Sequence, residues 1–154
     1  MEYVIVKWLH ILSSTLLFGT GLGSAFYMFF ASRTRDPRVI ATVVRYVVIA
    51  DWLFTTPTIL IQPLTGFYLL RLLGMPLTSK WVLGSVVLYI VAGAAWLPVV
   101  WMQIRMRDMA QAACASNAPL AERYWQYLRC WVALGVVAFV ALVVVFYLMV
   151  AKPM

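Results

Sequence analysis

The sequence predicts an all-α protein, a bundle of four antiparallel transmembrane helices. Of its 154 residues, 65% are hydrophobic and 11% are charged, whereas a soluble domain carries about 25% charged residues. Four apolar stretches, at about residues 4–30, 46–70, 80–102 and 125–150, each reach the length of about 20 residues that a bilayer-spanning helix needs. Three short connections use the remaining length, so we expect one integral membrane domain over residues 1–154.

We expect the first stretch, residues 4–30, to be retained as a membrane span. It is longer than the apolar core of a secretory signal peptide, about 7–15 residues, and it has no basic leader. Thr15, Gly19 and Gly23 recur in it at intervals of four, a spacing that lets two helices approach closely. The same glycines would equally make room for a flat macrocycle.

Prolines interrupt the second and third spans. Pro57, Pro63 and Pro98 each remove a backbone N–H and bend the helix, which frees the carbonyl four residues earlier. The carbonyls expected to need another partner are those of Leu53, Ile59 and Ala94. Such bends widen a bundle locally, as an internal pocket requires.

The connections predict the topology. Gly74 and Pro76 mark a tight turn that makes the second and third spans antiparallel neighbours. The basic residues near the first and third connections are Arg33, Arg35, Arg38, Arg45, Arg105, Arg107, Arg123 and Arg129, against Lys7, Arg71, Lys80 and Lys152 at the opposite end. Because basic residues favour the cytoplasmic side, we expect a bacterial inner-membrane protein with both termini in the periplasm. The net charge of +7 follows from this orientation, so no nucleic-acid partner is expected.

His10, the one histidine in the chain, lies about two turns into the first span. Imidazole is a frequent ligand of haem iron, and ionisable groups inside a bilayer are candidates for function. We therefore consider His10 as the metal ligand of a b-type haem. The alternative is a neutral histidine hydrogen-bonded to a neighbouring helix. Ser14 and Gly21 share its face and suit either a macrocycle or a tight helix contact.

Further polar residues surround His10 in the outer half of the predicted bundle. Lys80 opens the third span as a candidate second ligand, although a lysine there ordinarily extends to the interface. Lys7 is an interfacial anchor or a partner for a porphyrin propionate. Gln62 and Tyr68 complete this outer group. Most tryptophans (Trp8, Trp81, Trp96, Trp101, Trp125 and Trp131) fall near span ends and are expected to anchor at the headgroups.

Asp51 is the one acidic residue inside a predicted span, a turn or two from the inner surface. An unpaired carboxylate is costly there. Arg45, Arg105 and Arg129 are expected at similar depth, which predicts a structural ion pair in the inner leaflet. The alternative is a proton relay that serves a redox centre.

Six segments spread over the chain carry a family resemblance: residues 7–12 (KWLHIL), 18–23 (FGTGLG), 50–54 (ADWLF), 62–66 (QPLTG), 96–101 (WLPVVW) and 103–107 (QIRMR). With them the chain resembles a bacterial family of small four-span integral membrane proteins of unassigned function. More distantly, it is similar to the membrane-bound, haem-containing type of protoporphyrinogen oxidase. That resemblance implies His10 as the haem ligand and Lys80 as a second ligand or substrate-side group.

Together these observations predict a protein that binds haem b and acts in electron transfer or in oxidation of a quinol- or porphyrinogen-like substrate. Around an iron bound by His10, the expected haem contacts are Lys80, Gln62, Ser14, Gly21 and Lys7. The alternative is a non-enzymatic helical subunit or assembly factor of a larger membrane complex, or a homo-oligomer. Such a protein would use Thr15, Gly19 and Gly23 as its contact surface. The sequence leaves open whether the protein is an enzyme.

Overall fold

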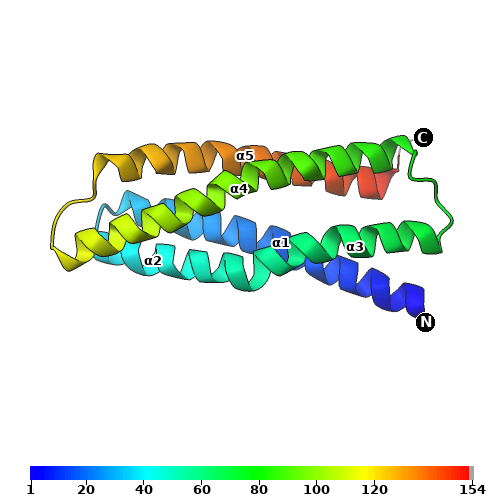
Figure 1. The fold of residues 1–154 in the computed structure, drawn as a ribbon, viewed down its shortest axis with the longest axis horizontal. Helices are drawn as coiled ribbons and strands as arrows, with labels where there is room; N and C mark the ends of the chain where they lie inside the picture. Colours follow the sequence, from blue (N-terminus) through cyan, green and yellow to red (C-terminus); the bar gives the residue numbers. More distant parts are fainter. Residues whose placement is uncertain (153–154) are drawn as a thin grey trace.

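The computed structural model describes residues 1–152 and contains four long antiparallel helices (Figure 1). They are α1 (Glu2–Arg33), a second helix divided into α2 (Pro37–Ala50), η1 (Asp51–Thr55) and α3 (Thr56–Leu72), α4 (Lys80–Ala115) and α5 (Glu122–Ala151). All four are long and apolar enough to cross a membrane. The predicted all-α four-helix transmembrane bundle is thereby confirmed.

The second helix begins earlier than its apolar pattern predicts. Asp36 caps it by accepting a hydrogen bond from the backbone N–H of Arg38 at 2.9 Å, and Pro37 occupies its first turn. Most of the expected connection 31–45 is therefore helical. Because α2 contributes 14 residues before Asp51, that side chain lies roughly 20 Å along the helix. It is near the middle of the span, not a turn or two from its end.

The end of the bundle that holds the two arginine-rich connections is tightly packed. The buried apolar residues there are Met28, Ile40, Ala41, Val44, Val47, Val99, Met102, Met106, Ala110, Tyr124 and Trp131. Within this core the hydroxyls of Ser32 and Tyr124 are hydrogen-bonded at 2.7 Å, which ties α1 to the start of α5. The buried core of the bundle is therefore concentrated at this end.

The opposite end, where both termini and the connection 73–79 lie, is built from helix pairs (Figure 1). There α1 packs mainly against α3, whereas α4 packs mainly against α5. Contacts between α1 and α5 are sparse in comparison. The pairs therefore leave space between them as they run from the packed end.

The second helix widens at η1, directly before Pro57. The backbone N–H of Thr56 donates to the carbonyl of Asp51, five residues earlier, and the Thr56 hydroxyl contacts the same oxygen at 3.0 Å. A proline ring would otherwise collide with the carbonyl four residues before it. Wide turns of this kind occur frequently at functional sites, and here the turn carries Asp51 and Thr55 on the buried face.

Candidate functional site: a cavity in the middle of the bundle

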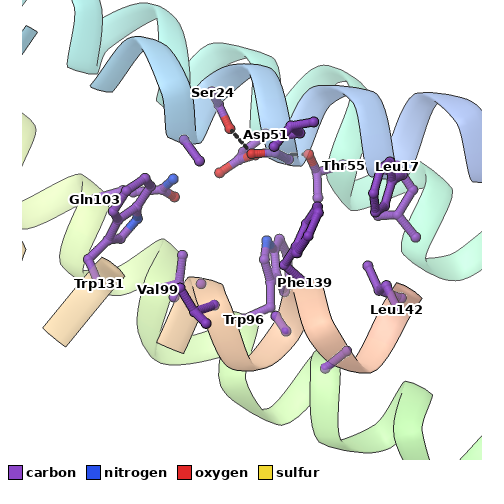
Figure 2. Close-up of a pocket in the computed structure, with 18 of the residues that line it drawn as sticks. Leu17, Ser24, Asp51, Thr55, Trp96, Val99, Gln103, Trp131, Phe139 and Leu142 are labelled. Atoms are coloured by element: carbon purple, nitrogen blue, oxygen red, sulfur yellow. Dashed lines mark hydrogen bonds between the residues drawn. The ribbon is translucent and has the colours of Figure 1, made fainter. Parts of the chain in front are cut away.

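A cavity of about 460 Å³ lies between the four helices, and every one of them lines it. Its wall is largely apolar and aromatic, as small-molecule sites usually are. Several polar side chains line it, among them Asp51 and Thr55 on η1, Trp96 and Gln103 about two turns apart on α4, and Trp131 on α5. Figure 2 shows these side chains arranged around the open space, with Phe139 on the α5 side.

Asp51 is 5% exposed, and the side chains that interact with it are uncharged. The Thr55 hydroxyl donates to its Oδ1 at 2.8 Å, and the Gln103 side chain lies close enough to interact with the same carboxyl. The predicted ion pair with Arg45 or Arg129 is wrong. Both arginines are exposed, and among residues 1–152 the ion pair formed is Arg107–Asp108. Arg129 is only two residues from the cavity-lining Trp131, but its side chain is exposed and does not reach Asp51.

Three buried side-chain polar atoms in the described chain have no hydrogen-bond partner: Trp96 Nε1, Gln103 Oε1 and Trp131 Nε1. All three residues line this one cavity. An unpartnered buried polar atom is costly, by about 1–3 kcal/mol, and is uncommon in folded proteins. Two N–H donors and one carbonyl acceptor thus belong to residues around one shared space, and the protein provides no partner for them.

His10 lies outside this cavity, against α3. Its Nδ1 is 2.8 Å from the Thr65 hydroxyl oxygen, and that hydroxyl donates to the carbonyl of Ile61 at 2.7 Å, so Nδ1 carries the hydrogen. The ring covers Gly66, where an added Cβ would stand 3.3 Å from His10 Cε1. Of the interpretations made from the sequence, this geometry matches the histidine hydrogen-bonded to a neighbouring helix.

Gln62 takes part in the same α1–α3 contact and lies beside His10, as predicted for the outer polar group. Its amide nitrogen donates to the His10 carbonyl and to the Ser13 hydroxyl, each at 3.0 Å. Tyr68 bonds instead to Glu2, near the start of α1. The structure thus brings His10 and Gln62 together and places Tyr68 further along the same helix pair.

The remaining predicted haem contacts are dispersed. Lys80 is exposed at the start of α4, a helix that packs mainly against α5 and α2 and not against the helix of His10. Lys7 is exposed over the Tyr3 ring, and the Ser14 hydroxyl donates to the Ile11 carbonyl. Gly21 does line the cavity, about three turns from His10 along α1.

The cavity residues do not fit a haem. The wall contains no imidazole, thioether or thiol, and its one phenol, Tyr89, donates its hydrogen to the Ile59 carbonyl at 2.8 Å. No lysine or arginine lines the wall to balance two propionates. Residues 1–152 also contain no group of three or more His, Cys, Asp or Glu side chains arranged to hold a metal ion.

The glycines of the small-residue stripe of α1 are not closely packed against another helix among the described residues. Thr15 and Gly19 are exposed, and open space lies beside both Gly19 and Gly23. The four-residue spacing predicted close helix packing as one possibility. Such packing within the chain is absent at these two glycines.

The model of one protein family matches residues 4–153, almost the entire chain. That family is DUF2269, described as a predicted integral membrane protein. The chain belongs to this family. No curated protein and no solved structure matches it. The expected membership of a small membrane-protein family without an assigned function is confirmed, and the DUF2269 model adds no activity to it.

Sequence reasoning missed most of the polar side chains that line the cavity. Trp96 and Trp131 were expected near span ends, yet they lie inside α4 and α5 and face the interior. One signal was available on the second helix, where Asp51, Thr55, Thr58 and Gln62 are spaced by four, three and four residues and are all buried. A polar stripe at helical spacing predicts an inward-facing polar surface.

Proposed function

We propose that this protein binds a quinone or quinol within the bilayer, with the polar ring of the ligand between Asp51, Gln103, Trp96 and Trp131. The observation that supports this is the convergence of three unpartnered buried polar atoms on one apolar cavity. Indole N–H groups suit the carbonyl oxygens of a quinone, whereas Gln103 Oε1 and the Asp51 carboxyl suit the hydroxyls of a quinol. The aromatic wall suits a flat ring.

Two properties of the cavity favour a quinol over a porphyrinogen, the other substrate class considered. A porphyrinogen carries several carboxylates, and buried carboxylates need cationic or hydrogen-bonding partners. Asp51 is the one ionisable carboxyl in the wall and no basic side chain accompanies it. A ligand with an uncharged polar head is therefore the better match.

The binding test uses purified protein in mild detergent and a decyl-tailed benzoquinone, in its oxidised and reduced forms. We expect saturable binding that raises the melting temperature with ligand concentration. Trp96→Phe and Trp131→Phe each remove one donor, which should weaken binding by about 2- to 10-fold. Trp52→Phe is the matched control, because Trp52 is 60% exposed and does not line the cavity.

Two results would contradict quinone binding. One is a wild-type protein that shows no saturable binding of either form. The other is an equal loss of affinity in Trp52→Phe and in the cavity variants, which would mean a non-specific effect of removing an indole. Mass spectrometry of lipids extracted from the purified protein gives an independent measure of which amphiphile occupies it.

Haem b at His10 stays a prediction, and the same preparation tests it. A haem there would lie outside the cavity, and the hydrogen bond from Nδ1 to Thr65 would orient the ring as the partners of ligating histidines commonly do. A Soret band that sharpens with dithionite and disappears in His10→Ala would support it. A colourless wild-type protein would exclude haem from this preparation.

A subunit or assembly role is the second candidate function, favoured by the unpartnered stripe of Thr15, Gly19 and Gly23. In this role α1 would pack against a helix of another membrane protein or of a second copy. Gly19→Leu should then reduce the apparent size of the detergent-solubilised complex. An unchanged elution position, at equal concentration, would contradict it.

We also propose a bacterial inner-membrane location with both termini in the periplasm. The termini and the connection 73–79 lie at the same end of the bundle (Figure 1), and the eight arginines named above lie toward the other. The positive-inside rule assigns that arginine-rich end to the cytoplasm.

A further inference from the structure

We infer that the ligand of this cavity is a long-tailed, membrane-resident quinone that enters sideways between α1 and α5 and leaves its tail in the lipid. This rests on the proposed function and specifies its ligand class and route. The argument concerns the seam between α1 and α5, defined here by the cavity-lining residues of those two helices.

Several residues of this seam face the cavity and the exterior at once. Leu22 and Phe26 on α1 are 50% and 56% exposed, Val136 on α5 is 56% exposed, and all three line the cavity. A side chain that is accessible from both sides stands at an opening. Because these helices lie inside the membrane-spanning part, that opening meets acyl chains and not bulk water.

Glycines keep the seam wide. Gly21 on α1 and Gly135 on α5 both line the cavity, and a Cβ added at either would have no atom within 4 Å. Toward the end of the bundle that holds the termini, Phe18 closes the seam. Its ring stacks on Phe139 with 5.0 Å between ring centroids and meets Phe146 edge-on with 5.3 Å between centroids. The opening is therefore bounded on one side by an aromatic contact.

The size of the cavity determines what must pass through the opening. A volume of about 460 Å³ is within the range of sites that enclose drug-sized molecules, about 300–1,000 Å³. It accommodates a quinone ring and the first part of a tail. A longer isoprenoid tail has to extend outward, and the apolar seam residues give it a continuous path into lipid.

The test compares a decyl-tailed benzoquinone with the same ring lacking its tail, in wild-type protein and in seam variants. At Gly21 and Gly135 an added Cβ meets no atom within 4 Å, and leucine is a better helix former than glycine, so Gly21→Leu and Gly135→Leu should fold and fill the seam. Ala133→Leu is the matched control, because Ala133 is exposed on the same helix and does not line the cavity.

We expect wild-type protein to prefer the tailed compound at least tenfold. Either seam variant should reduce that preference by about 5-fold or more, whereas Ala133→Leu should retain it. Equal affinity for both compounds in the wild type, or unchanged preference in both seam variants, overturns the lateral route while leaving quinone binding in place. Absence of binding by either compound would instead overturn the proposed function itself.

Discussion

The Tyr89 hydroxyl donates a hydrogen bond to the carbonyl oxygen of Ile59 at 2.8 Å, across from α4 to α3. That carbonyl lacks its usual helical partner because the residue four positions later is Pro63. Ile59 is one of the three carbonyls that the sequence marked as free. Both residues also line the cavity, so this bond fixes α3 against α4 where the helices diverge.

Tyr89→Phe should destabilise the bundle by about 1–3 kcal/mol, the cost of leaving a buried acceptor without a partner. Pro63→Ala restores a backbone N–H for the Ile59 carbonyl. In the Pro63→Ala background, Tyr89→Phe should therefore cost clearly less, and the double-mutant cycle gives the coupling between the two sites. Unfolding in mixed micelles with increasing dodecyl sulfate measures all four proteins. Identical costs in both backgrounds would contradict this account.

The transmembrane bundle was predictable because the number, length and hydrophobicity of the apolar stretches are almost sufficient to determine it. Helix ends were harder to predict. Arg38 and Arg45 suggested a polar connection, yet Asp36 and Pro37 form a good N-terminal cap and the helix continues through both arginines. The Asp36–Pro37 pair is a helix-start signal in the sequence itself, whereas the arginines around it resemble a polar connection.

The site was less predictable, for a reason that lies in the depth of its residues. Tryptophan favours membrane interfaces, so Trp96 and Trp131 were assigned there, and an inward-facing tryptophan carries no distinct local pattern. Asp51 is recognisable as the one acidic residue inside a predicted span, but the sequence does not show that Arg45 and Arg129 point outward. His10 is conspicuous in the sequence as the one histidine, whereas its partner Thr65 on α3 is identified only by the fold.

The effect of Gly66→Ala on stability should change when the imidazole of His10 is removed. Gly66→Ala places a Cβ 3.3 Å from His10 Cε1, so the ring must shift and the protein should lose about 0.5–1 kcal/mol of stability. With His10→Ala the ring is gone, and Gly66→Ala should become neutral or stabilising because alanine is the better helix former. Equal effects of Gly66→Ala with and without the imidazole would show that the contact is unimportant.

We expect the carboxyl of Asp51 to lower the unfolding free energy of the bundle and to strengthen quinol binding. Asp51→Leu removes a carboxyl from the middle of a span, where an aspartate costs up to about 3 kcal/mol, so we expect an increase of about 1–3 kcal/mol in unfolding free energy. The same variant should weaken quinol binding more than quinone binding, since the carboxyl accepts from a hydroxyl. Asp51→Asn, which keeps an acceptor for Thr55, is the matched comparison. A destabilised Asp51→Leu would assign the carboxyl a structural role.

The orientation of the bundle should be visible by cysteine labelling. In a background with Cys114→Ser and Cys130→Ser, the variant Leu77→Cys places an exposed thiol in the connection 73–79, and Ala121→Cys places one at the arginine-rich end. A membrane-impermeant maleimide applied to spheroplasts should label Leu77→Cys at once and Ala121→Cys only after permeabilisation, because eight arginines hold the second end in the cytoplasm. The opposite result, with Ala121→Cys labelled at once and Leu77→Cys only after permeabilisation, would place both termini in the cytoplasm. It would also mean that the charge bias does not set the orientation of this protein.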